Sequence, residues 1–444
     1  MMTDQKQFQS SRRRFLAGSA VASAGLLLQD KLVFSNPASA NVAISPGYVS
    51  TQYYGELEKQ ALSNVIDTGT PFRYWGDGTP DKVKNFEEGF ADYMGTRFAL
   101  GVTSGTTALN SAIAALEVGP GDEVIVPAYS WWSDYTCVIN AGALPVFADI
   151  DASFNLDPED FERKITPRTK AVLAVHLIGG PCDMDPIMEI ARKHNIKVLE
   201  DCAQCVGGAY KGKKLGSIGD IGIYSFQINK MISSGEGGAV VTNDPYLYER
   251  ACRFHDMGDM RRVFEERLGE IKVPMFPGEN YRMSEFTGAV LGAQLTKLER
   301  MVRDQKKNAD MVYDGIRDLP GIRLRKQPDP AGDIGYGVFF DAGNKEKQSL
   351  CIKRLRDMKL PAATLTGSVL LPIQESVVNK HTRHPNWPSF NTHEGKAIQY
   401  GPDCCRQTLD VYDRFVQVRI GPKYTEEENK RIIESVREVY GMLS

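Results

Sequence analysis

The chain has 444 residues, too many for one small hydrophobic core, and this length predicts a large domain and a smaller one. With 42% hydrophobic and 25% charged residues, it has the composition of a soluble globular enzyme, which excludes an intrinsically disordered chain. The net charge of −3 does not point to nucleic acid as a partner.

The first 40 residues differ from the rest in charge and pattern. They carry five basic and two acidic residues, and the stretch from Phe15 to Leu28 is uncharged and apolar. Its 14 residues are too few to span a bilayer comfortably, which takes about 20. Small residues, Ala38-Ser39-Ala40, follow as at a signal-peptide cleavage site. Ser11 to Leu16, "SRRRFL", resembles the twin-arginine export motif S-R-R-x-F-L.

We therefore expect residues 1–40 to be a twin-arginine signal peptide, with the mature chain starting at Asn41 in the periplasm or cell envelope. Twin-arginine export carries folded proteins, so it favours a cofactor enzyme. The alternative is a basic, disordered tail beside a chance apolar helix, and the protein would then be cytoplasmic.

From residue 85 to 245, strand-like and helix-like segments alternate. The predicted strands in chain order are DEVIVPA, ALPVFADI, AVLAVHLI, KVLED, DIGIYSF and GGAVVTND. The predicted helices in this region are TALNSAIAAL and DPIMEIARKHN. This alternation predicts an α/β fold with a largely parallel sheet and helices on both faces.

The second half predicts a connector and a smaller domain. Residues 285–316 have the pattern of one long helix, which would link a large domain at 41–300 to an α/β C-terminal domain at 301–444. Near the end, Thr425 and Glu428 form a capping box that opens an amphipathic helix.

Three features lie near predicted strand ends, where open α/β sheets bind ligands. Ser-Gly-Thr-Thr at 104–107 opens a helix, whose free N–H groups bind anions, although such residues also cap helices that bind nothing. Asp201 ends a strand, where it holds a protonated ring nitrogen or simply caps a turn. Lys230 follows the next strand, and near a cofactor it could form a Schiff base, although a lysine before glycines is more often a surface residue.

The cysteines and histidines predict no metal site. The eight cysteines show no paired zinc spacing, and the six histidines do not cluster. Cys202-Ala-Gln-Cys205 is a C-x-x-C motif, for which we favour buried packing over a redox role.

Seven motifs together carry a family resemblance. They are SGTTAL, GPGDEVIVPAYSW, GALPVFADID, VHLIGGPCDMDPI, EDCAQCVGGAYKGKKLGSIGDIGIYSF, GEGGAVVTND and NYRMSEFTGAVLGAQL. In this order they resemble the DegT/DnrJ/EryC1/StrS family of sugar aminotransferases, which have fold type I and bind pyridoxal 5′-phosphate. The resemblance runs from about Tyr54 to Glu438.

The resemblance implies roles around the cofactor ring. Lys230 would form the Schiff base and move protons, and Asp201 would pair with the ring nitrogen. Gln204 would bond the ring hydroxyl. Trp131, or its neighbour Trp132, would stack on the ring.

The resemblance also implies how the phosphate is held. The backbone amides of Thr106 and Thr107 and the hydroxyl of Ser225 would bind it. Asn280 matches an asparagine that reaches the phosphate from a second subunit. This match implies a homodimer with shared active sites.

The pattern departs from the family around the pocket. Gln227 stands near a position that often holds His or another aromatic-type residue. Cys202 and Cys205 replace alanines, and "PAYSWWSDYT" differs from the usual Thr-Phe version. These changes concern substrate choice more than cofactor use. A subgroup with dehydratase chemistry has His in place of the lysine, so Lys230 favours transamination.

The expected reaction is therefore amino transfer from an amino acid, glutamate or glutamine, to a keto sugar or keto cyclitol. Arg419 could hold the donor carboxylate, although a surface charge is the commoner role for arginine. The alternatives are a sensor that binds the cofactor without turnover, and a fold-type I lyase. Export would make a nucleotide-linked acceptor less expected than a free sugar or cyclitol.

Overall fold

The computed structural model describes residues 42–74 and 81–443, and the described residues from Ala43 onward cluster as one unit. The predicted signal peptide at residues 1–40 lies outside the described residues. Within the described ranges, no helix combines the length and the apolar character that crossing a bilayer requires.

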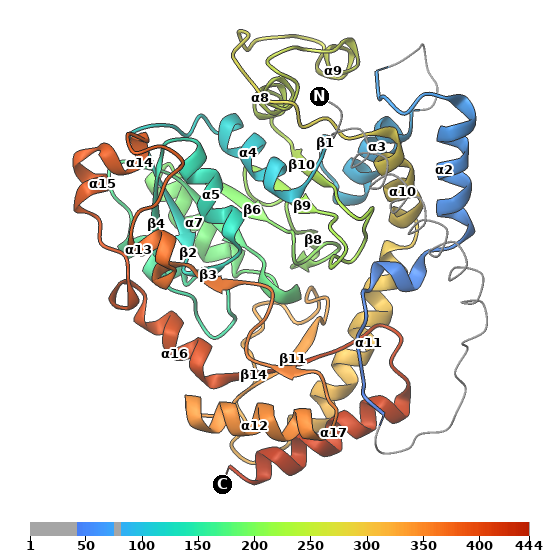
Figure 1. Ribbon diagram of the computed structural model, residues 1–444, viewed down its shortest axis with the longest axis vertical. Helices are drawn as coiled ribbons and strands as arrows, with labels where there is room; N and C mark the ends of the chain where they lie inside the picture. The colour runs from blue at the N-terminus through green and yellow to red at the C-terminus, as the bar shows by residue number, and fades with distance from the viewer. Residues whose placement is uncertain (1–41, 75–80, 444) are drawn as a thin grey trace, which may run out of the picture. The chain divides into compact units, whose positions relative to one another are not determined.

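A seven-stranded sheet forms the centre of the fold, in the order β1-β10-β9-β6-β5-β2-β4 (Figure 1). The strands are β1 Phe98–Val102, β2 Glu123–Pro127, β4 Leu144–Ala148, β5 Thr169–Val175, β6 Lys197–Asp201, β9 Ile221–Ser225 and β10 Gly238–Thr242. The five strands from β9 to β4 pair in parallel, and β10 pairs antiparallel with both β9 and β1. This sheet confirms the predicted α/β fold, and six of its strands coincide with the six predicted from the sequence.

Helices cover both faces of the sheet because successive strand residues point to opposite sides. In β2, Val124 and Val126 pack into one apolar cluster and Ile125 into the other. The first cluster includes residues of α4 Gly105–Ala115, α5 Trp132–Asn140 and α8 Pro245–His255. The second includes residues of α3 Lys82–Met94, α7 Met184–His194 and α10 Glu285–Leu295. Strands that are apolar on both faces are typical of a buried parallel sheet.

The prediction of one helix over residues 285–316 is wrong, because the stretch divides into α10 and α11 Leu298–Ile316. The Thr296 hydroxyl donates to the Ala293 carbonyl, and the Lys297 ammonium bonds the Tyr53 carbonyl and the Glu58 carboxylate. These contacts stabilise the interruption between α10 and α11. The spacing of apolar residues in the sequence does not indicate this interruption.

A second, three-stranded sheet lies in the C-terminal part, in the order β11-β14-β12. Its strands are β11 Gly337–Asp341, β12 Ala362–Ala363 and β14 Phe415–Arg419. Residues of α11, α12 Lys345–Asp357 and α17 Glu426–Gly441 share a separate apolar cluster with these strands. The capping box of Thr425 and Glu428 opens α17, as predicted. The division into 41–300 and 301–444 stays a prediction.

The remaining elements are short or peripheral. The helices are α2 Glu56–Thr68, α6 Pro158–Arg163, α9 Arg262–Leu268, α13 Glu375–Val378, α14 Pro388–Asn391, α15 His393–Ala397 and α16 Arg406–Arg414. The strands are β3 Tyr129–Ser130, β7 Ala209–Tyr210, β8 Lys213–Lys214 and β13 Val369–Leu370. The pairing of β13 with β3 brings the C-terminal chain to the strand end before Trp131.

Candidate active site

A cavity of about 620 Å³ lies at the carboxyl ends of the parallel strands. Six of the eight predicted site residues line it: Lys230, Asp201, Gln204, Thr106, Trp131 and Ser225. Asp201 and Ser225 are the last residues of the neighbouring strands β6 and β9. The structure therefore brings together side chains that are far apart in the sequence, as the strand-end argument predicts.

Lys230 occupies a tight turn after β9. Its N–H donates to the Gln227 carbonyl at 2.8 Å, and Gln227 pairs with Gly235 across the loop. Burial of the side chain lowers the pKa of Lys230, although the nearby Asp201 and Asp134 carboxylates oppose this shift. A lysine with a lowered pKa is more often uncharged at neutral pH, which Schiff-base formation requires.

The start of α4 forms a narrow cradle beside the end of β9. A Cβ on Gly105 would lie 2.6 Å from the Ser225 Cβ, and one on Gly238 would lie 2.2 Å from the Ser104 carbonyl oxygen. Glycine at both positions therefore lets the helix N-terminus approach the strand closely. Such a terminus offers unbonded N–H groups and a positive dipole end to a phosphate.

The two threonines of this turn have different environments. The Thr106 hydroxyl bonds Ser133 Oγ at 2.6 Å and lies at the cavity. The Thr107 N–H donates to Ser104 Oγ at 3.2 Å, and its hydroxyl accepts from the Ser104 N–H at 2.9 Å. Thr107 thus closes a capping box and does not line the cavity. Its amide's role with phosphate stays a prediction.

The two tryptophans point to different places. Trp131 lines the cavity and is 50% exposed, whereas Trp132 packs against the core. Of the two, Trp131 is therefore the one placed to cover a ring bound in the cavity.

Gln204 lines the cavity and is held from two sides. Its Oε1 accepts from the Ile178 N–H at 3.2 Å, and its Nε2 donates to the Gly367 carbonyl and to Ser368 Oγ at 2.9 and 3.0 Å. The amide is thus oriented by the protein itself. Its predicted bond to the ring hydroxyl stays a prediction.

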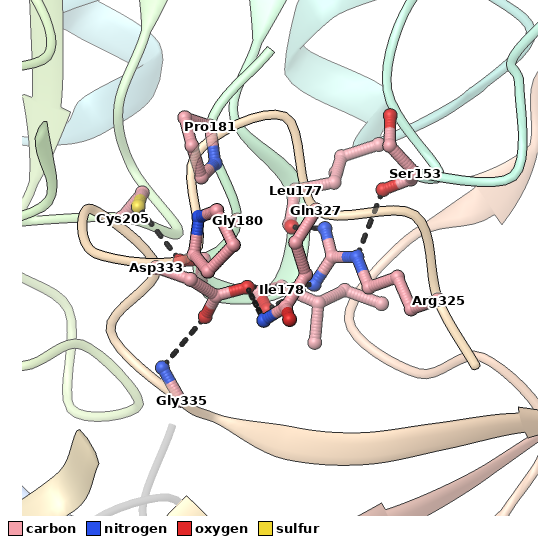
Figure 2. Close-up of polar contacts among 12 residues, drawn as sticks. Ser153, Leu177, Ile178, Gly180, Pro181, Cys205, Arg325, Gln327, Asp333 and Gly335 are labelled. Atoms are coloured by element: carbon pink, nitrogen blue, oxygen red, sulfur yellow. Dashed lines mark hydrogen bonds and ion pairs between the residues drawn. The ribbon is translucent and has the colours of Figure 1, made fainter. Parts of the chain in front are cut away.

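Arg325 fixes the turn that holds Gln204, and the sequence analysis missed it. Figure 2 shows its guanidinium among the carbonyls of Ser153, Leu177 and Ile178, to which it donates at 2.9, 2.7 and 3.0 Å. Ile178 has a φ of 48°, a strained value for a β-branched residue. The three bonds stabilise that strained turn. Nothing in the local sequence distinguishes Arg325 from its neighbour Arg323.

We expect Arg325→Met to lower the free energy of unfolding by about 3–5 kcal/mol, because it leaves three carbonyls and the Asp333 carboxylate without their buried partner. Arg323→Met is the matched control. That side chain is 65% exposed in its ion pair with Asp341, so the loss should stay below about 1 kcal/mol. Urea unfolding of both variants measures the difference, and equal losses would contradict the assigned role of Arg325.

Asn280, Arg419 and Gln227 lie in different places around the site. Asn280 is exposed and outside the cavity, where its backbone pairs with Asp256. Arg419 ends β14 and lines the cavity. Gln227 also lines it, and its Oε1 accepts from the backbone and side-chain nitrogens of Asn229, both at 2.9 Å.

The C-x-x-C cysteines are packing residues, as predicted. Cys202 and Cys205 are free and fully buried, and burial raises the pKa of both thiols well above the ordinary value. A redox cysteine needs exposure and a lowered pKa, and neither holds here.

His176, Glu200 and Cys202 lie within ligand distance of one another, but other bonds engage two of them. His176 Nδ1 accepts from the Cys182 N–H, which leaves Nε2 to donate to Glu200 at 3.1 Å. The Glu200 oxygens also accept three backbone N–H groups, from Gly216, Ile218 and Gly219. We therefore interpret these three residues as part of a structural hydrogen-bond network.

Fold and site together define a class of protein. A lysine of lowered pKa in the cavity, a strand-end aspartate and a glycine-lined helix N-terminus suit a pyridoxal phosphate enzyme of fold type I. The profile of the DegT/DnrJ/EryC1/StrS aminotransferase family matches residues 54–437, and the chain belongs to this family.

Relatives are similar over different lengths. The chain is 46% identical over 222 residues to a GDP-perosamine synthase of Caulobacter vibrioides, a match that covers 49% of the chain and 57% of that relative. It is 37% identical to a GDP-perosamine synthase of Escherichia coli O157:H7, covering 77% of the chain and 93% of the relative. It is 36% identical to an L-glutamine:2-deoxy-scyllo-inosose aminotransferase of Streptomyces fradiae, a match that covers 71% of the chain and 74% of that relative.

Solved structures agree on the fold, and one of them contains the cofactor. The 3-amino-5-hydroxybenzoic acid synthase matches with a TM-score of 0.74 at 28% identity, covering 90% of this chain and 100% of that one. A dehydratase of E. coli with bound hydrated pyridoxal phosphate matches with a TM-score of 0.70 at 26% identity, again covering 90% and 100%. The protein is a pyridoxal-phosphate-dependent aminotransferase.

Proposed function

We propose that the protein transfers an amino group from glutamate or glutamine to a keto sugar or keto cyclitol. The observation that carries the proposal is Lys230, which lines the cavity with Asp201, at a position where the dehydratase subgroup has a histidine. The names of the relatives support both classes of acceptor, since two are perosamine synthases and one is an inosose aminotransferase.

The site residues have distinct tasks in this reaction. Bound pyridoxal phosphate supplies the electron sink that makes the donor's α-proton acidic. Lys230 Nζ, whose pKa burial lowers, would accept that proton and return it at the other carbon. Asp201 would keep the ring nitrogen protonated, while the α4 N-terminus and Ser225 would bind the phosphate. Trp131 would cover the ring and exclude water.

The acceptor can be identified once an amino donor has converted the bound cofactor to its amine form. Purified protein is incubated with glutamate or glutamine, freed of donor, and then mixed with single keto sugars or keto cyclitols. An accepted substrate restores the original absorbance band of the cofactor within one turnover. If none of a broad panel of either class restores the band, the proposed acceptor class is wrong.

Arg419 is our candidate for the donor carboxylate, because it lines the cavity and a guanidinium can bind a carboxylate through two N–H groups. We expect Arg419→Met to raise KM for glutamate by about 10- to 100-fold, the loss of a charge-assisted bond. The kcat should change much less, since the bond persists in the transition state. Arg317→Met is the control, with a side chain that is 63% exposed. An unchanged KM would place the carboxylate elsewhere.

We further propose a homodimer in which Asn280 serves the neighbouring site. The exposed position of Asn280, outside the cavity of its own chain, supports this arrangement. Mixing Lys230→Ala and Asn280→Ala subunits tests it, because each mixed dimer would hold one complete site. Activity above the sum of the two separate variants is expected. No gain after verified subunit exchange would rule out shared sites.

The export signal is likewise our proposal and concerns residues outside the described ranges. Its basis is the charged start, apolar middle and small-residue end of residues 1–40. Sequencing the N-terminus of protein from separated cell fractions tests it. Asn41 in the envelope fraction is expected, and Met1 in the cytosol would contradict export. Export would favour a free sugar or cyclitol as acceptor.

A further inference from the structure

We propose that Asp134 is an uncharged carboxylic acid that donates a hydrogen bond to the Asp201 carboxylate. This bond positions Asp201 for its pairing with the cofactor ring nitrogen. The proposal rests on the cofactor site described above. It assigns a role to Asp134, which the sequence analysis included in the stretch PAYSWWSDYT but gave no role.

The placement of Asp134 is the first observation. It lies in the first turn of α5, has no solvent exposure and lines the cavity together with Asp201. Its Oδ2 accepts from the Ser130 hydroxyl. Its Oδ1 is buried and has no hydrogen-bond partner among residues 42–74 and 81–443. A buried oxygen without a partner is costly, and a proton directed at a nearby carboxylate removes that cost.

The charges around this pair are the second observation. The pair consists of Asp134 on α5 and Asp201 on β6. The titratable groups that face it are Cys137 on α5 and Lys230 and Glu236 after β9. Lys230 is the only basic group among them, and its own pKa is lowered. Two adjacent carboxylates in such a setting cannot both be ionised.

The environments of the two carboxyl groups indicate which of them carries the proton. Burial and the neighbouring Asp201 carboxylate raise the pKa of Asp134 well above its ordinary range. Asp201 ends its strand and accepts from the Ala203 N–H at 2.7 Å, whereas Asp134 Oδ1 has no donor among the described residues. We therefore place the proton between the two groups on Asp134.

The same turn of α5 also reaches the phosphate end of the cavity. Ser133, next to Asp134, bonds the Thr106 hydroxyl at 2.6 Å. One helical turn thus contacts both the group that would hold the ring nitrogen and the helix start that would hold the phosphate. Asp134 is a positioning residue, because it acts through Asp201.

Infrared spectroscopy tests the protonation state directly, in cofactor-free as well as loaded protein. A protonated buried carboxyl should give a carbonyl band at neutral pH that Asp134→Asn removes. Asp160→Asn serves as the control for a buried aspartate, since Asp160 pairs with Arg163 and accepts from the Asp149 N–H. Absence of the band in the wild-type protein would overturn the proposal, and that measurement needs no variant.

Cofactor affinity gives a second readout. Asp134→Asn keeps a neutral N–H donor, so its dissociation constant for pyridoxal phosphate should stay within about threefold of the wild type. Asp134→Ala loses the bond to a charged group and should bind about 10-fold more weakly. A large change in the Asn variant, or equal affinities in all three proteins, would contradict the assignment. Failure of wild-type protein to bind the cofactor would instead refute the cofactor site itself.

Discussion

Replacing Lys230 with alanine abolishes amino transfer, with an expected fall in kcat of at least about 10⁴-fold. Lys230 supplies both the covalent attachment and the proton transfer, and acid–base catalysis alone contributes about 10²–10⁴-fold. No other lysine lines the cavity among the described residues to replace it. Single-turnover kinetics with glutamate measure the loss.

The chemical signature of the Lys230 variant is as informative as its rate. Borohydride should attach pyridoxal phosphate covalently to the wild-type protein at Lys230, and peptide mapping should find no label there or elsewhere in Lys230→Ala. Lys213→Ala, at the exposed first residue of β8, is the matched control and should label fully. A variant that keeps the absorbance band and the label would show that another lysine carries the cofactor.

Changing Asp201 to asparagine should lower kcat by about 10²–10³-fold. The carboxylate keeps the ring nitrogen charged, and removal of one preorganised electrostatic partner in a buried site costs about that much. The covalent attachment at Lys230 should persist, so the absorbance band remains while turnover falls.

The control for Asp201 is Asp185→Asn, an exposed aspartate paired with Lys211. Its kcat should equal that of the wild type. If Asp201→Asn retained full kcat with intact cofactor binding, the ring nitrogen would have another partner and the site would need reassignment.

The sheet was predictable because its strands are apolar on both faces and alternate with helices. KVLED, for example, became β6, with Asp201 at its carboxyl end as the pattern predicts. The break between α10 and α11 was not predictable, because Thr296 and Lys297 fit a helical pattern. Lys297 instead bonds Glu58, more than 200 residues away, and no local signal reports such a contact.

The site was predictable where residues follow strand ends in a recognisable motif. Lys230, Asp201 and Ser225 meet in one cavity for that reason. Arg325 and Asp134 were missed because their roles depend on burial. Arg325 binds carbonyls from two distant loops, and Asp134 acquires its role by lying beside Asp201. Proximity of this kind arises only from tertiary structure.

The most direct test of the central claim is the spectrum of the purified, cofactor-loaded protein during one half-reaction. Addition of glutamate or glutamine alone should shift the cofactor band to the amine form and release one equivalent of the 2-oxo acid. A keto sugar or keto cyclitol should then reverse the shift and carry the amino group. A band that no amino donor shifts would contradict the account and indicate a protein that binds the cofactor without amino transfer.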